Sequence, residues 1–175
     1  MAHIPSIEQE SPEALKAVLI DAGLFLVAYE LIRSHVVRPV EFFYADTTFG
    51  PGLSFIDFET DVGSRSKHRF DACLLWLRDH MKAITPQQYT SIHRVREFRD
   101  NLSHGIHKEI QKHNFREATA LLIEARDALF ALDNFWVRME IQADPDFSHI
   151  KDWSVVHSGS FAMLDVLLKT VRPTG

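Results

Sequence analysis

The sequence predicts an all-α protein, an antiparallel bundle of four to five helices that forms a single domain over residues 1–175. Apolar residues recur at alternating spacings of three and four in several segments, as they do along bundle helices. Helix start signals precede three of these segments. Seven glycines and seven prolines are too few for a disordered or many-turned all-β chain. A hydrophobic content of 46% with 25% charged residues is ordinary for a soluble domain with its own core.

The first predicted helix starts at Ser11-Pro12-Glu13, which supplies an N-cap, a proline at the first helical position and an early acid. We expect it to end at Pro39, because the proline pushes Arg38 out of helical geometry. The apolar positions between these limits form the seam of a bundle helix. They are Leu15, Val18, Ala22, Phe25, Tyr29, Ile32 and Val36.

Residues 40–65 change character and predict a loop insertion with a short hairpin or an extended segment. The stretch EFFYADTTFGPGLSFIDFETDVG contains a Gly-Pro-Gly turn signal and an alternating FIDFETD pattern. If that segment is extended, Asp57, Glu59 and Asp61 share one side. They then form either a metal site or a solvated strand face, and the solvated face is the favoured interpretation.

Four further helices follow this loop. One is predicted over about 67–83, and the next starts at Thr85-Pro86-Gln87-Gln88, where Thr85 and Gln88 are spaced as a capping box. A second capping box, Asn114-Phe115-Arg116-Glu117, starts another helix. The C-terminal helix is expected at about 160–171, packed through Phe161, Leu164, Leu167 and Leu168.

Composition restricts the compartment and the partners. Cys73 is the only cysteine, so it forms no internal disulfide and fits a reducing compartment. No signal-peptide pattern is present, and the most apolar stretch, VLIDAGLFLVAYELI, is interrupted by Asp21 and Glu30. We therefore expect a cytoplasmic protein without a membrane segment. The net charge of −5 argues against a protein that coats nucleic acid through bulk positive charge.

The predicted helix that starts at Thr85 carries an unusual polar cluster. Arg99 falls inside its apolar stripe, where an arginine must find an acid, reach water or line a cleft. Asp100 and His104 are four residues apart, so they can hydrogen-bond. The side chains that point to one side next to the stripe are His93, Arg96, Asp100, His104 and His107.

Three interpretations of this cluster are open. On the first, Arg96 and Asp100 are an ordinary exposed pair and His104 is solvated, which leaves the position of Arg99 less well explained. On the second, His104, His107 and Asp100 share a metal ion. No HExxH motif and no cysteine ligand support the second, so a site without a metal ion is favoured. On the third, the cluster acts on a phosphate.

The segment Arg99-Asp100-Asn101-Leu102-Ser103-His104 resembles the motif of the HEPN superfamily, in which four to six residues separate an arginine from a histidine. It departs from that motif at Asp100, where asparagine is commoner. The resemblance implies an all-α, metal-independent endoribonuclease of the toxin or defence type, without a cofactor. It also implies a homodimer with the motif at its interface, and an antitoxin or nucleotidyltransferase as a partner.

Carried over to this sequence, the resemblance makes His104 the acid–base group and Arg99 the phosphate clamp, with Asp100 or Asn101 as the orienting residue. Flanking RNA contacts are expected from Arg96, His93, His107 and Lys108. Histidine moves protons near neutral pH, and an arginine fork stabilises the charge that develops on the phosphate. The rival interpretation is a non-catalytic HEPN-like module that binds a nucleotide, RNA or a protein.

Helix geometry adds a constraint to this prediction. Arg99 and His104 point roughly 140° apart on an ideal helix. They converge either if the helix is distorted near Gly105, or if a second subunit brings two motifs around a shared cleft.

Overall fold

The computed structural model describes residues 12–45, 57–112, 115–142 and 144–171, and within these ranges every regular element is helical. The side chains of residues 14, 104–112, 115–117 and 171 lie outside this description. The all-α prediction is confirmed for the described ranges. The elements are α1 (Pro12–Ala45), α2 (Phe58–Asp61), η2 (Gly63–Arg65), α3 (Arg69–Asp79), α4 (Pro86–Lys112), α5 (Phe115–Ile141), η3 (Pro145–Phe147), η4 (Trp153–Val155) and α6 (Gly159–Val171).

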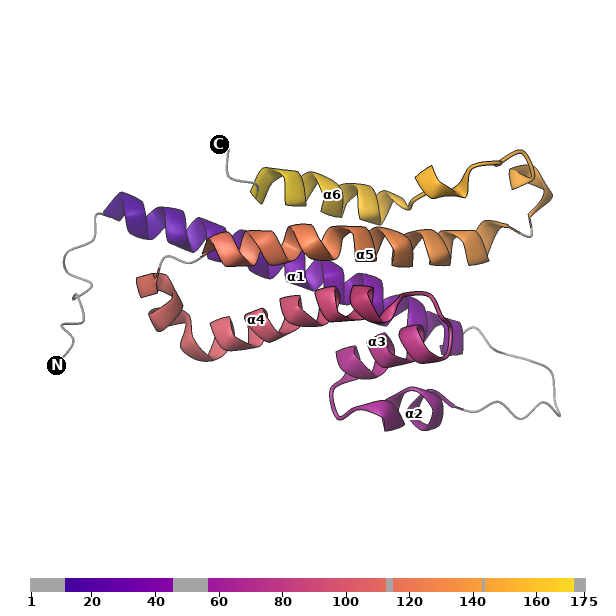
Figure 1. Ribbon diagram of the computed structural model, residues 1–175, viewed down its shortest axis with the longest axis horizontal. Helices are drawn as coiled ribbons and strands as arrows, with labels where there is room; N and C mark the ends of the chain where they lie inside the picture. Colours follow the sequence, from indigo (N-terminus) through magenta and orange to yellow (C-terminus); the bar gives the residue numbers. More distant parts are fainter. Residues whose placement is uncertain (1–11, 46–56, 113–114, 143, 172–175) are drawn as a thin grey trace.

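Helix α1 is the centre of the arrangement, because it contacts α3, α4, α5 and α6. Helices α4, α5 and α6 alternate in direction, and α6 lies along α5 on the side away from α4 (Figure 1). The short helices α2 and α3 lie near the end of the bundle where α4 begins (Figure 1). Within the described ranges, none of the helices is long and apolar enough to cross a bilayer.

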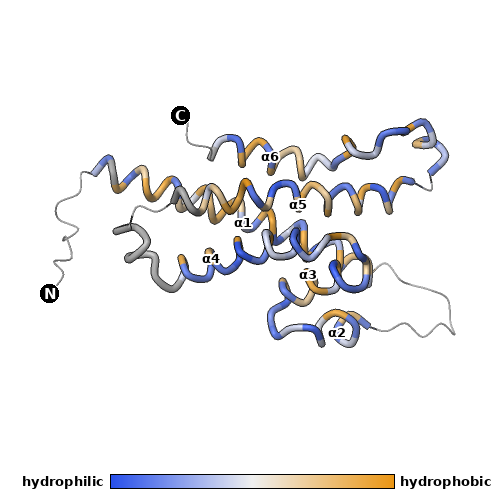
Figure 2. The backbone as a smooth tube through the Cα atoms, in the orientation of Figure 1, coloured by the Kyte–Doolittle hydropathy of each residue, from blue (hydrophilic) through white to orange (hydrophobic). Residues whose placement is uncertain are grey.

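The core follows the predicted seams. Val18, Ala22, Phe25, Tyr29, Ile32 and Val36 of α1 are all buried. Helix α5 buries a set of residues with the same alternating spacing of three and four: Ala118, Leu122, Ala125, Leu129 and Leu132. Apolar segments alternate with polar ones along each tube in Figure 2, as expected of helices that pack through one stripe.

Helix α1 does not end at Pro39, so that prediction is wrong: the helix continues to Ala45. An internal proline costs a helix about 3 kcal/mol, because it removes a donor and crowds the preceding turn. Packing beyond it offsets this cost. Val40 is completely buried, and the rings of Phe43 and Tyr44 lie 5.5 and 5.7 Å from the ring of Trp76.

The prediction of a loop with extended structure over 40–65 is also wrong where the structure describes this region. Residues 40–45 belong to α1, and 58–61 and 63–65 are helical, while 46–56 lie outside the described residues. Asp57 starts α2 because its carboxylate accepts the backbone N–H of Thr60 at 2.8 Å. Asp61 instead accepts hydrogen bonds from the Tyr44 hydroxyl and from Trp76 Nε1. Asp57 and Asp61 therefore have separate partners within the fold.

The capping box at the start of α4 is confirmed. The backbone N–H of Gln88 donates to Thr85 Oγ1 at 3.2 Å, and the N–H of Thr85 donates to Gln88 Oε1 at 2.8 Å. Helix α3 is shorter than the predicted 67–83, and α6 occupies Gly159–Val171, where a helix is expected at about 160–171. The predicted N-cap at Ser11 and the capping box at 114–117 fall outside the described residues and side chains.

Candidate functional site

The predicted site residues all belong to helix α4, which runs without interruption from Pro86 to Lys112. Helix α4 thus continues past Gly105, and its last turns bend away from the line of the rest of the helix (Figure 1). The structure describes the side chains of His93, Arg96, Arg99, Asp100 and Asn101. The side chains of His104, His107 and Lys108 lie outside the described part, so the expected Asp100–His104 contact stays a prediction.

Arg99 lies at the edge of the apolar stripe, where its side chain is 37% exposed. Its guanidinium carbon lies 5.2 Å from the ring centre of Tyr29 on α1, which is a cation–π distance. Nη1 donates to Asp100 Oδ1 at 3.1 Å. Burial raises the pKa of the Tyr29 hydroxyl, and Arg99 opposes that shift. Arg99 therefore pairs with an acid, Asp100, and also keeps part of its side chain in water. These are two of the three outcomes that the sequence predicts for it.

Arg96 has a different environment from Arg99. Its Nη1 donates to Asp71 Oδ2 of α3, and the two side chains are only 14% and 11% exposed. Its Nη2 lies 3.2 Å from Asp100 Oδ2, the i,i+4 pair that the sequence predicts. Arg96 therefore does not belong only to an ordinary exposed pair. It also joins α4 to α3 through a buried ion pair with Asp71.

Asp100 connects the two arginines. One carboxylate oxygen faces Arg96 and the other accepts from Arg99. The result is a continuous chain of contacts from Asp71 through Arg96, Asp100 and Arg99 to Tyr29. Because its first link is buried, this chain can hold the exposed guanidinium of Arg99 in one orientation.

His93 stands at the other end of the cluster. Its Nε2 lies 3.6 Å from Asp71 Oδ1 and its Nδ1 lies 3.6 Å from Glu97 Oε1, so both acids are just beyond hydrogen-bond distance. The imidazole stacks on Tyr89 with ring centres 5.6 Å apart, and Arg78 covers the Tyr89 ring at 4.5 Å. The structure gives His93 and Arg96 partners within the fold, and their contact with RNA stays a prediction.

Basic residues that the sequence places near the site are paired with acids. Arg94 Nη1 lies 2.6 Å from Glu124 Oε2 of α5. Arg69 Nε lies 2.5 Å from Glu41 Oε1 of α1. Arg94 of α4 and Arg69 of α3 are thus matched by acids on neighbouring helices. Of the two arginines in the predicted site, Arg99 keeps the more accessible guanidinium.

Two residues of this arrangement were missed from the sequence. The sequence does hold a signal for Asp71, because this acid lies inside the apolar run FDACLLWL and needs a buried partner. Tyr29 is a member of the α1 seam, and nothing in the spacing distinguishes it from the other core residues. Among the side chains that the structure describes, no three histidines, cysteines, aspartates or glutamates come together in a group that could hold a metal ion.

A second polar cluster, also missed, joins α1, α5 and α6. Asp133 accepts the backbone N–H of Ser158 at 2.7 Å and its hydroxyl at 2.6 Å. His35 donates from Nδ1 to the carbonyl of Leu31 at 2.8 Å, and its Nε2 lies 3.8 Å from Asp133 Oδ1. Ser158 Oγ in turn accepts the N–H of Phe161 at 3.1 Å. Because Ser158 is bonded to Asp133 and not to the histidine, this cluster is a helix cap and no nucleophile–base pair.

Comparisons with known proteins leave the family open: no family model, no curated protein and no solved structure matches this chain.

Proposed function

We propose that this chain is a HEPN-like, metal-independent endoribonuclease of the toxin or defence type that acts in the cytoplasm as a homodimer. The observation that carries the proposal is the placement of Arg99. Of the two arginines that flank Asp100, Arg96 is buried against Asp71, whereas Arg99 presents its guanidinium at the surface over Tyr29. A guanidinium held at the surface in this way is suited to bind a phosphate.

In the proposed reaction, the RNA 2′-hydroxyl oxygen attacks the adjacent phosphorus and the bond to the 5′-oxygen breaks. The products are a 2′,3′-cyclic phosphate and a 5′-hydroxyl. His104 moves the proton, and Arg99 stabilises the negative charge on the phosphate oxygens. Asp100 orients Arg99, since their side chains are 3.1 Å apart. Asn101 is exposed on the same helix and is the alternative orienting residue.

The proposed site geometry calls for a second subunit. On an ideal helix, Arg99 and His104 point roughly 140° apart. Two motifs around one cleft bring an arginine and a histidine together without distortion of the helix. An antitoxin or a nucleotidyltransferase is the proposed regulatory partner.

The second candidate is a non-catalytic HEPN-like module that binds a nucleotide, RNA or a protein. The observation in its favour is the charge balance of the site. Asp100 lies within 3.2 Å of both Arg96 and Arg99, so each guanidinium already faces a carboxylate. A phosphate must then compete with the Asp100 carboxylate for the Arg99 guanidinium. Such competition suits reversible binding of a ligand.

RNA cleavage in EDTA distinguishes the two candidates. We expect the wild-type protein to leave 2′,3′-cyclic phosphate ends, and Arg99→Ala and His104→Ala to abolish cleavage with the helical fold intact. Arg94→Ala is the matched control, because it removes an exposed arginine of the same helix that pairs with Glu124. RNA binding without cleavage supports the non-catalytic module. Cleavage that survives both substitutions contradicts a role for this motif.

A further inference from the structure

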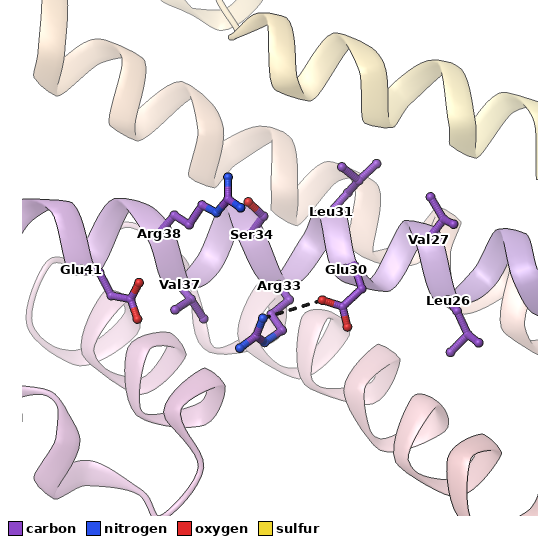
Figure 3. Close-up of a pocket in the computed structure, with 9 residues that line it drawn as sticks. All are labelled: Leu26, Val27, Glu30, Leu31, Arg33, Ser34, Val37, Arg38 and Glu41. Atoms are coloured by element: carbon purple, nitrogen blue, oxygen red, sulfur yellow. Dashed lines mark ion pairs between the residues drawn. The ribbon is translucent and has the colours of Figure 1, made fainter.

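Helix α1 has an open groove along one face. Its volume is about 600 Å³, and every residue that lines it comes from α1 itself. Figure 3 shows these side chains along α1, which passes between α5 and α6 above and α3 and α4 below. The lining residues are Leu26, Val27, Glu30, Leu31, Arg33, Ser34, Val37, Arg38 and Glu41.

The first half of α1 is apolar on this outer face as well as on its core face. Leu19, Ile20 and Val27 are each about half exposed, although they belong to the most apolar stretch of the chain. A helix that is apolar all round is usually covered all round. Among the described residues, only one side of α1 is covered, so its outer side lacks the cover that its composition predicts.

Gly23 lies on the same outer face, one turn from Leu19 and one turn from Val27. A Cβ added at Gly23 meets no atom within 4 Å, so no contact inside the described chain requires a glycine there. Glycine in a helix interior costs about 0.5–1 kcal/mol relative to alanine. The missing side chain allows another backbone to approach closely, and none of the described residues does so.

We infer that the outer face of α1 is the interface between two copies of this chain, with the two α1 helices packed antiparallel about a twofold axis. In such an interface each contact occurs twice, so the surface must complement itself. Glu30 and Arg33 meet that condition: they are exposed, lie 3.7 Å apart near the middle of the groove, and carry opposite charges.

A twofold axis that passes beside residues 31 and 32 gives the register. It places Glu30 opposite Arg33 of the partner subunit, and the same pair recurs on the other side of the axis. It also places Leu26 opposite Val37 of the partner subunit, and both residues line the groove. This register pairs the opposite charges of Glu30 and Arg33, whereas Val37 is only 5% exposed and adds little apolar area.

The charges of the groove favour a second copy over RNA. Among the residues that line the groove, Glu30 and Glu41 balance the charges of Arg33 and Arg38, so the groove has no net positive charge. A phosphate backbone needs such a charge for binding. The inference deepens the proposed function, because it names the surface through which the dimer forms. It rests on the proposed function only for the role of the dimer in RNA cleavage. Arg99 lies over Tyr29 on α1, so the groove and the proposed site share this helix.

The test is the oligomeric state of the purified full chain, measured by sedimentation equilibrium over a wide concentration range. We expect a dimer for the wild type. Glu30→Arg and Arg33→Glu each place like charges across the axis and weaken the dimer at least about tenfold. The double variant Glu30→Arg/Arg33→Glu restores the opposite pairing and the dimer. Both residues are exposed, so the helix content should remain that of the wild type.

Val166→Asp is the control, because it puts the same kind of change on an exposed apolar residue of α6, outside the groove. Val27→Asp should dissociate the dimer and Val166→Asp should not. A monomeric wild type overturns the inference, and so does a dimer that Val166→Asp dissociates and Val27→Asp does not. A dimer that Val27→Asp dissociates but that does not cleave RNA supports the inference and contradicts the proposed function. Cleavage by a monomer overturns the inference and the homodimer of the proposed function, and supports only the RNA cleavage itself.

Discussion

Arg96 and Asp71 form a buried ion pair that joins α4 to α3, with side chains only 14% and 11% exposed. Removing one partner of such a pair leaves the other charge buried and uncompensated. We expect Asp71→Ala to lower the free energy of unfolding by about 3 kcal/mol, as measured by urea unfolding. The control is Glu124→Ala, which breaks the exposed pair with Arg94 and should cost under about 1 kcal/mol. Equal losses for the two variants would contradict a buried role for Asp71.

The neighbouring arginine should behave differently. Arg99 is 37% exposed and has a surface acid and an aromatic ring as partners. Such contacts contribute about 0.5–1 kcal/mol. Arg99→Ala should therefore lower the free energy of unfolding by under about 1 kcal/mol, whereas Arg96→Ala should cost several times more. This contrast matters for the RNA assay, because a loss of cleavage in Arg99→Ala then reflects the site and not the fold. Comparable destabilisation by both substitutions would remove that distinction.

The first turn of α6 depends on Ser158, whose hydroxyl accepts the N–H of Phe161 and donates to Asp133. Replacing an N-cap serine by alanine typically costs about 1 kcal/mol. We expect Ser158→Ala to lower the free energy of unfolding by about this amount in urea. Ser160→Ala, an exposed change two residues later, should stay within about 0.5 kcal/mol of the wild type. A neutral Ser158→Ala would show that α6 docks without this cap.

Stability should fall in acid because of Asp165, which joins α6 to α5. A hydrogen bond from Arg126, then one from Lys169, lowers the pKa of the Asp165 carboxyl below its usual value. A carboxyl with a lowered pKa stabilises the fold above its unfolded pKa of about 3.9. That contribution is lost as the pH falls through the lowered folded pKa. Asp165→Asn should therefore be less stable than the wild type at neutral pH and lose less stability on acidification.

Thermal unfolding at a series of pH values measures this difference. The control is Asp21→Asn, which changes an exposed acid of α1 and should leave the acid dependence close to that of the wild type. If Asp165→Asn keeps the full acid dependence, other carboxyls account for it. Asp61 is the next to examine: burial favours a higher pKa there, but bonds from Tyr44, Trp76 and Arg65 lower it overall.

The helices and their buried faces could be predicted because they depend on local spacing. The seam of α1 and the Thr85–Gln88 capping box each follow from residues within one or two turns. The end of α1 could not. A local rule places it at Pro39, but Trp76, 37 positions along the chain, provides the packing that extends the helix. Tertiary contacts outweighed the local preference at this point.

The candidate site shows the same division. The one-sided cluster of His93, Arg96 and Asp100 could be predicted from the helical period. The different environments of Arg96 and Arg99 could not, because the period gives a direction and not a partner. Asp71 distinguishes them, and it lies 25 residues before Arg96 on another helix.

Cys73 provides a probe of local opening in α3. The thiol is completely buried, and burial, with a smaller contribution from Glu41, raises its pKa to about 12. Because the thiolate is the reactive form, we expect very slow modification at neutral pH in the folded protein. The reaction should accelerate in urea in parallel with the loss of helix content. An added cysteine at the exposed Met163 of α6, measured in the same chain, should react rapidly without urea. Rapid labelling of Cys73 in native buffer would mean that α3 opens well before the rest of the fold.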